Sequence, residues 1–418
     1  MKKEIIAGSL VILMLLLALT GCADSGQQTN VVQTDYDPYE EIAPYLDNLP
    51  DIPEEDKDYV IQMGYYDCDH MVAAIIGEAT GLYEALDLNV VVTKTGQVAA
   101  AMGSGDMVVG YSGFSSMVKA ANKGAPVFMP ANNHLGGSKY FVVRKDITSA
   151  EELIGARITV TEEDMYSPYW LSYCEQVGIP TDYTLYDGVD MKQEDAMYAL
   201  KAGQIDGFMC CDPYASIVEE EGIGKIIGVE WGGHISEDLQ SGWGLHCGYF
   251  INRDFADAHP ELTTRLVLAH CLAIKYMYEH PYNAAMMFAD DFGTSPDVGL
   301  RTMFLKTNAE GRTLSWHVDE TNIQNYLDFW YSFGIPEEKI PYVKDMASFF
   351  DLTYLEACGI ESFDTFLNES KINEKFPLFM PYLEWVEKAE IIDGIDPSTT
   401  VGKKVEKWNN NERVSKLN

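Results

Sequence analysis

The stretch "AMGSGDMVVGYSGFSSM", residues 101–117, decides how this 418-residue chain is built. A helix-forming run leads into a turn at Gly105 and Asp106, an apolar strand-like run follows, and a polar loop then opens another helix. The same plan returns in "ALKAGQIDGFMCCDPYASI", residues 199–217. One unit that occurs twice predicts two lobes, each of which presents the loop after a strand to a shared cleft.

Short apolar runs alternate with helical segments on both sides of this stretch. The strand-like runs at 59–65, 88–93, 107–112 and 126–131 are separated by helical patterns of about ten residues. A second series begins at Ser149, which stands three residues before Glu152 in the spacing of a capping box. The alternation predicts an α/β fold with two lobes and largely parallel sheets.

The alternation also sets the expected boundaries of the lobes. We expect the first lobe to comprise residues 58–145 and, after a return strand in "GLHCGYFIN", residues 245–345. The second lobe is expected at 146–244, and residues 346–418 are expected to form a helical extension. The polar end of that extension, "KKVEKWNNNERVSKLN", has no apolar periodicity and is expected to fray.

The amino-terminal segment predicts the compartment. Two lysines precede an uncharged apolar run that ends in "TGC", which is typical of a signal peptide at 1–21 cleaved before a lipidated Cys22. The apolar run is short for a membrane span, which needs roughly 20 residues, so an uncleaved anchor is the less favoured alternative. Residues 22–57 are polar and aperiodic, as expected of a linker. We therefore expect an extracytoplasmic protein that contacts the membrane through lipid only.

Composition excludes some partners. The formal net charge is −36, so the surface repels nucleic acid, and no nucleic-acid partner is expected. The chain has 8 cysteines, and the seven that follow Cys22 are an odd number without a regular disulfide spacing. We expect these seven to be mostly buried free thiols.

Five segments in series resemble a known family. They are "GEATGLYEALDLNVVVTKTG", "AMGSGDMVVGYSGFSSMVKAANKGAPVFMPANN", "YFVVRKDITSAEELIGARITV", "ALKAGQIDGFMCCDPYASIVEEEG" and "YFINRDFADAHPE". Together they are similar to the substrate-binding proteins of ABC importers in the nitrate/sulfonate/taurine/bicarbonate group. The resemblance implies a type II periplasmic-binding fold, a cleft that closes on a small-molecule ligand, and a membrane permease as partner.

The loops that follow strands in the first lobe supply candidate ligand-binding residues, because sites in α/β proteins lie at the carboxyl ends of strands. Tyr65, Tyr66 and His70 stand in the first such loop, and the resemblance supports them. Asp69 is expected to cap the helix that begins near Met71.

Two further loops of the first lobe carry small polar residues. Ser112 and Gly113 form a turn that can bring backbone N–H groups to an oxyanion, although Ser115 there could simply cap the next helix. Asn132 and Asn133 precede the crossover and could hydrogen-bond a ligand.

In the second lobe the candidates are Tyr166, Asp212 and Trp243. Asp212 either caps a helix or contacts the ligand, and its sequence position leaves both roles open.

The candidate loops hold few cations, with Lys139 only at their margin, so a guanidinium fork for a bare anion is not indicated. We expect a small polar organic ligand that is amine-bearing or heteroaromatic, or sulfonate- or taurine-like as the resemblance implies. No catalysis, cofactor or metal is expected.

Three alternatives stay open. A metal or metal-chelate binding protein would use the groups in "DCDH", "CCDP" and "LHC", although no C-x-x-C or H-x-x-x-H spacing is present. An enzyme similar to the pyrimidine-precursor synthases is the second alternative, and a signalling module that uses binding to gate a receptor is the third.

Overall fold

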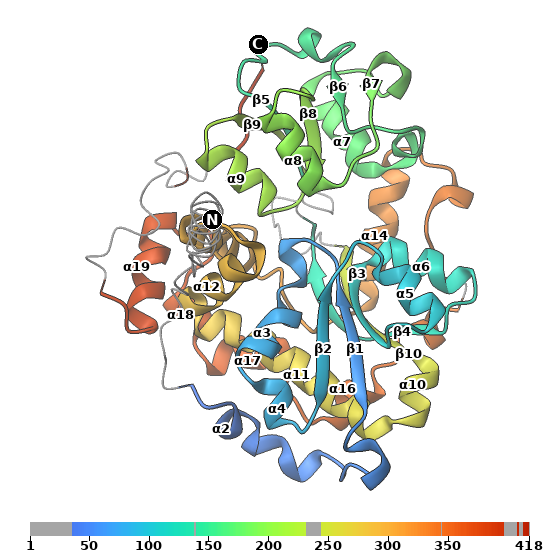
Figure 1. Cartoon of the computed structure of the whole chain (residues 1–418), viewed down its shortest axis with the longest axis vertical. Coiled ribbons are helices and arrows are strands. Elements are labelled where there is room, and N and C mark those ends of the chain that lie inside the picture. Colours follow the sequence, from blue (N-terminus) through green and yellow to red (C-terminus); the bar gives the residue numbers. More distant parts are fainter. Residues whose placement is uncertain are drawn as a thin grey trace, which may run out of the picture. The chain divides into compact units, whose positions relative to one another are not determined.

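The computed structural model describes residues 36–137, 139–230, 244–343, 345–396, 408 and 413–417. The expected signal peptide, the lipidation site at Cys22 and the candidate Trp243 lie outside the described residues. Within them the chain forms two five-stranded sheets, as the repeated unit predicts (Figure 1). The sheet built around β1 with its helices is called the first lobe, and the sheet built around β5 with its helices the second lobe.

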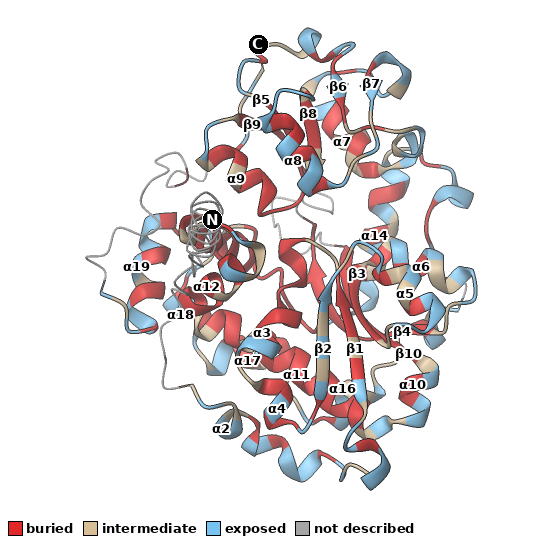
Figure 2. Ribbon diagram, viewed as in Figure 1, coloured by how far each residue is buried: buried red, intermediate tan, exposed pale blue. Residues whose placement is uncertain are grey.

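The first sheet has the strand order β2–β1–β3–β10–β4. Its strands are β1 (Val60–Tyr65), β2 (Asn89–Lys94), β3 (Val109–Gly113), β4 (Val127–Leu135) and β10 (Leu245–Asn252). β1 is parallel to β2 and β3, whereas β10 runs antiparallel to both β3 and β4. The return strand thus lies inside the first sheet, and all eight of its residues are buried (Figure 2).

The second sheet has the order β7–β6–β8–β5–β9. Its strands are β5 (Lys139–Arg144), β6 (Arg157–Ile158), β7 (Asp187–Gly188), β8 (Gly207–Cys210) and β9 (Gly224–Glu230). β5 runs antiparallel to β8 and β9. Each sheet thus contains one reversed strand, and the other four strands share one direction, so the expectation of largely parallel sheets holds apart from that strand. β5, which we assigned to the first lobe, belongs to the second sheet.

Period-two alternation along β5 explains how helices cover both faces of the second sheet. Tyr140 and Val142 pack with α8 (Gln193–Lys201) and α9 (Tyr214–Glu220). Phe141 and Val143 pack with α7 (Pro168–Val177). The 3₁₀ turn that precedes β6, Ala150–Leu153, begins with the capping box of Ser149 and Glu152, which confirms the spacing read from the sequence.

The helices not yet named belong to the first lobe. The largest is α11 (Pro260–Glu279), most of which is buried (Figure 2). The others are α2 (Pro38–Ile42), α3 (Ala73–Ala79), α4 (Leu82–Ala85), α5 (Val98–Ser104), α6 (Phe114–Asn122), α10 (Arg253–Ala258), α12 (Pro281–Phe292), α13 (Pro296–Phe304), α14 (Glu320–Ser332), α15 (Met346–Phe349), α16 (Thr353–Ala357), α17 (Phe363–Glu369), α18 (Ile372–Lys375) and α19 (Tyr382–Ile392). None of the described helices combines the length and the apolar character needed to cross a membrane. The seven cysteines after Cys22 are all buried and free, which confirms that expectation.

The described part of the carboxyl-terminal tail is docked rather than frayed. The Arg413 guanidinium lies 2.7 Å from the Asp212 carboxylate, and the Ser415 backbone N–H donates to the Ile226 carbonyl at 2.7 Å. The Trp408 indole N–H donates to Glu219 at 3.0 Å. The expectation of fraying is wrong for these residues, because individual side-chain and backbone hydrogen bonds, and not a periodic apolar face, hold the tail in place.

Candidate ligand-binding site

A cavity of about 500 Å³ lies where the ends of strands from both sheets meet. Its walls come from the loop after β1, the ends of β3 and β8, the beginnings of β5 and β10, and the starts of α5, α6, α7 and α8. The lining residues with polar or aromatic side chains are Tyr66, Cys68, His70, Gln97, Ser112, Ser115, Ser116, Lys139, Tyr169, Lys192, Gln193, Cys210, Cys211, His246 and Cys247.

Helix starts also contribute to the cavity wall. Gln97 precedes α5, Ser115 and Ser116 lie in the first turn of α6, and Gln193 begins α8, and all four residues line the cavity. The first N–H groups of a helix have no partner within that helix, and the helix dipole favours negative charge there. These three starts therefore suit an anionic group of a ligand.

Some of the first-lobe residues that were predicted to bind a ligand line this cavity. Tyr66, His70, Ser112 and Gly113 line it. Tyr65 does not, because its hydroxyl donates to Asp291 of α12 at 2.7 Å. Consecutive residues at a strand end point to opposite sides, so only one of the two tyrosines can face the cavity.

Asn132 and Asn133 lie inside β4 and do not line the cavity. The Asn132 amide donates to the Ser315 carbonyl at 3.0 Å, and the Asn133 amide donates to the His70 carbonyl at 2.6 Å. Asn133 thus positions the turn that carries His70. The structure corrects the expectation that either asparagine faces a ligand, because β4 continues through them to Leu135 and buries both amides.

Two acidic residues of the candidate loops, Asp212 and Asp69, lie outside the cavity wall. The Asp212 carboxylate accepts from the Ser216 backbone N–H of α9 at 2.9 Å and from Arg413, and it is absent from the cavity wall. Of the two roles left open, the structure places Asp212 in the helix-capping one. Asp69 does not cap a helix, because its carboxylate is fully buried 3.2 Å from the Lys306 ammonium.

Tyr166 lies away from the cavity. Its side chain is exposed at the surface, and the Lys339 ammonium lies 4.6 Å from its ring centre. Tyr169, three residues further on, lines the cavity instead, with the Lys139 ammonium 4.5 Å from its ring centre. Pro168 begins α7 at this point, and the helix turns Tyr169 inward.

Sequence reasoning missed most of the residues at the beginnings of the reversed strands. Lys139 is the first residue of β5, and His246 and Cys247 lie at the start of β10. A signal for them was available, since antiparallel strands begin at the edge where parallel strands end.

The charge of the cavity wall differs from that of the whole chain. Among the described residues, Lys139 and Lys192 line the cavity and no aspartate or glutamate does, although the chain carries a net charge of −36. Burial raises the pKa of the nearby Asp69 to about 8, and the Lys306 ammonium opposes that rise. The wall is therefore suited to a ligand with negative charge.

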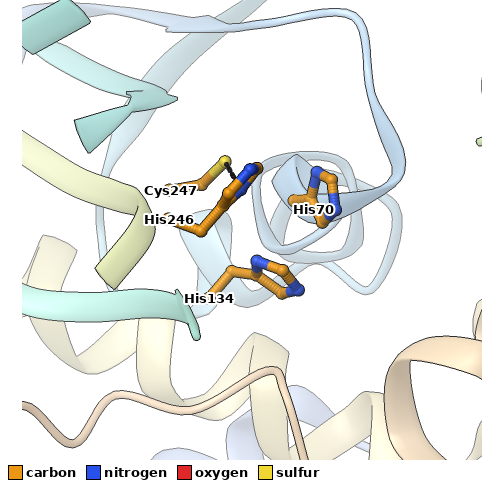
Figure 3. A group of neighbouring side chains, drawn as sticks. All are labelled: His70, His134, His246 and Cys247. Carbon is orange, nitrogen blue, oxygen red and sulfur yellow. Dashed lines mark hydrogen bonds between the residues drawn. The ribbon is translucent and has the colours of Figure 1, made fainter. Parts of the chain in front are cut away.

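Three histidines and a cysteine come together beside the cavity, and all of them except His134 line it (Figure 3). The ring centres of His70 and His134 are 4.1 Å apart, and those of His70 and His246 are 5.1 Å apart. Burial lowers the pKa of all three histidines well below the usual value, so the imidazoles are neutral. The Cys247 sulfur lies 3.1 Å from Nδ1 of His246.

Hydrogen bonds join the two lobes beside the cavity. The Asp69 backbone N–H donates to the Asp212 carbonyl at 3.0 Å, and the Tyr214 hydroxyl donates to the Asp67 carboxylate at 2.5 Å. The Gln193 amide also donates to the Asp67 carbonyl. Both lobes therefore shape the cavity, so a change in their separation alters its walls.

Two α/β lobes with a reversed strand in each sheet and a cavity at their junction define the class of two-lobed periplasmic-binding folds. Residues 54–289 match the model of the NMT1-like family, and the chain belongs to that family.

The chain is also similar to individual proteins. A taurine-binding periplasmic protein of Escherichia coli (strain K12) is 29% identical over 170 residues, which cover 40% of this chain and 49% of the relative. The chain thus spans about half the length of the curated relative it matches.

Two solved structures show the same fold. The alkanesulfonate-binding protein SsuA from Xanthomonas axonopodis pv. citri, bound to MOPS, matches with a TM-score of 0.53 and 16% identity over 67% of this chain and 95% of its own. The ligand-binding component of an ABC-type import system from Staphylococcus aureus, with zinc bound, matches with a TM-score of 0.56 and 14% identity over 72% and 98%. At these identities the likeness concerns the fold alone.

Proposed function

We propose that this protein is the extracytoplasmic solute-binding component of an ABC importer and that it captures a small organic molecule with an anionic group. Membership of the NMT1-like family and the similarity to a taurine-binding periplasmic protein support the transport role. The observation that carries the choice of ligand is the cavity wall, where Lys139, hydroxyl groups and helix starts converge without a described carboxylate.

The amine-bearing ligand favoured by the sequence loses its basis, because Asp212 is paired with Arg413 and does not reach the cavity. A sulfonate, or a zwitterion bound through its acidic end, fits the wall better. Tyr66 and Tyr169 give flat apolar area for the organic part of such a ligand.

Binding is coupled to the separation of the lobes in this proposal. A ligand that contacts Ser112 of the first lobe and Lys139 of the second stabilises the form in which the lobes approach each other. A membrane permease then recognises that form and accepts the ligand, and no covalent bond is made or broken.

Lipid at Cys22 completes the proposal, since it would hold the binding protein at the outer face of the membrane that carries the permease. Mass spectrometry of the amino-terminal peptide from membrane fractions tests this part. An unmodified Cys22 in protein released to the medium contradicts it.

A calorimetric titration with taurine, ethanesulfonate, nitrate and ethylamine tests the ligand class. We expect the sulfonates to bind and ethylamine not to bind. Lys139→Met should weaken sulfonate binding by roughly tenfold to a hundredfold, because a hydrogen bond to a charged group contributes about 1.5–3 kcal/mol. Lys145→Met, which alters an exposed lysine next to the end of β5, is the matched control and should leave the affinity unchanged. Equal binding by wild type and Lys139→Met would refute the assigned anion contact.

A further inference from the structure

The group formed by His70, His134, His246 and Cys247 has the composition of a transition-metal site. Each residue offers one nitrogen or sulfur atom, and these four atoms all lie within 4.8 Å of one another. The residues come from three segments, since His70 lies in the turn before α3, His134 in β4, and His246 and Cys247 in β10 (Figure 3). The fold, and not a local sequence motif, brings these ligand atoms together.

An irregularity in the backbone of β10 directs both His246 and Cys247 toward the cavity. A regular strand sends successive side chains to opposite faces, yet His246 and Cys247 both line the cavity. The pairing of β10 with β4 shifts register on both sides of Cys247, and Cys247 stands directly opposite His134. Irregularities of this kind redirect side chains and are frequent beside functional sites.

Several polar atoms of the group lack a hydrogen-bond partner in the structure. They are Nε2 of His70 and both ring nitrogens of His134, and both rings are fully buried. A buried polar group without a partner costs about 1–3 kcal/mol, so such atoms call for a ligand. Neutral imidazoles hold free lone pairs, which are the electrons that a metal ion accepts.

We propose that His70, His134, His246 and Cys247 bind one d-block cation of borderline softness, for which Zn²⁺ is the test ion. Imidazole nitrogen and thiolate sulfur are both donors that such a cation takes, and tetrahedral coordination separates its ligand atoms by about 3.3–3.7 Å. The four side chains therefore need to approach one another by little more than 1 Å, which is within about the reach of small rotamer changes. Binding displaces the Cys247 thiol proton to solvent.

Two lysines, Lys139 and Lys306, lie near enough to His70 and His246 to add to the lowering of both imidazole pKa values by burial, and their charges oppose an incoming cation. Lys306 is paired with Glu310 at 2.5 Å and lies 3.2 Å from the Asp69 carboxyl group. The incoming positive charge is compensated by the thiolate. A second group, formed by Cys68, Asp69, His70 and Cys211, also has its ligand atoms within 4.8 Å. It is the weaker candidate because its carboxylate is already paired with Lys306.

The experiment uses the mature full-length chain, stripped with a chelator and titrated with Zn²⁺ in a calorimeter and with Co²⁺ in a spectrophotometer. We expect one ion per chain, the intense visible bands of tetrahedral Co²⁺, and a sulfur-to-cobalt charge-transfer band. Cys247→Ser should abolish the charge-transfer band, and His134→Asn should keep it. Each change should weaken Zn²⁺ binding by more than about 100-fold, since changes to a metal's outer shell alone cost 10–100-fold.

Matched controls separate this site from adventitious binding. Cys358→Ser and His317→Asn alter a thiol and an imidazole outside the group and should leave Zn²⁺ affinity unchanged. Cys211→Ser should also be neutral, because it belongs to the second group. Absence of stoichiometric Zn²⁺ binding, or binding that survives Cys247→Ser, overturns the proposal.

The outcome is distinguishable from that of the proposed function. Sulfonate titrations are run with chelator present, so they report on solute binding without metal. If His134→Asn does not fold, the wild-type Co²⁺ spectrum and Cys247→Ser decide the matter alone.

Discussion

The ion pair between Arg413 and Asp212 gives a sharp test of how the tail contributes to stability. Nη2 of Arg413 lies 2.9 and 2.7 Å from the two Asp212 oxygens and 2.7 Å from the Ser216 hydroxyl. The guanidinium also lies 3.9 Å from the ring centre of Tyr140. Arg413→Met keeps most of the apolar stem but leaves the fully buried Asp212 carboxylate without its counter-ion.

We expect Arg413→Met to lower the free energy of unfolding by about 3–5 kcal/mol, which is the usual cost of breaking a buried pair from one side. Asp212→Asn should rescue most of that loss in the double variant, because it removes the stranded charge while asparagine still caps α9. Urea denaturation with an unchanged slope measures both effects.

The control for this prediction is Arg157→Met. Arg157 lies 3.8 Å from Asp187 in a largely exposed pair, and such pairs contribute about 0–1 kcal/mol. If Arg413→Met proves as mild as Arg157→Met, the tail does not dock as described. If the double variant is no more stable than Arg413→Met, a stranded charge is not the cause of the loss.

Two further predictions concern the first lobe. Burial lowers the pKa of His270 to about 4, so the unfolded chain gains a proton below pH 6.5 that the folded chain does not. The contribution of His270 to stability is therefore complete above pH 6.5 and falls by roughly 3 kcal/mol as the pH falls to 4, and His270→Gln should remove about one proton from the pH dependence in urea titrations. Gly299→Ala places a methyl group against the Ala285 carbonyl of α12, and it should lower the unfolding free energy by about 1–3 kcal/mol, whereas an unchanged denaturation midpoint would contradict this packing.

The order of strands and helices could be predicted from the sequence because each element carries its own local pattern. The strand-like run at 107–112 ends within one residue of the end of β3, whose last residues, Ser112 and Gly113, reach the cavity. The side of β1 to which Tyr65 points could not be predicted, because either of the two adjacent tyrosines could have faced the cavity. The partner of Asp212 lies 201 residues away and has no local signal.

The group of His70, His134, His246 and Cys247 was the hardest feature to predict. A search for closely spaced ligands fails when His134 and Cys247 become neighbours only through strand pairing. The rule that sites lie at the carboxyl ends of strands also omits Lys139 and His246, because reversed strands bring their amino-terminal ends to the same edge.

The distance between the lobes tests the central claim most directly. Spin labels at Lys123→Cys in the first lobe and Glu151→Cys in the second occupy exposed positions, while the seven cysteines after Cys22 are buried. Addition of the tightest-binding sulfonate should shorten and narrow the measured distance distribution, and Lys139→Met should require more ligand for the same change. A sulfonate that binds without altering the distribution, or the absence of sulfonate binding, would contradict a solute-binding protein whose lobes close on an anionic ligand.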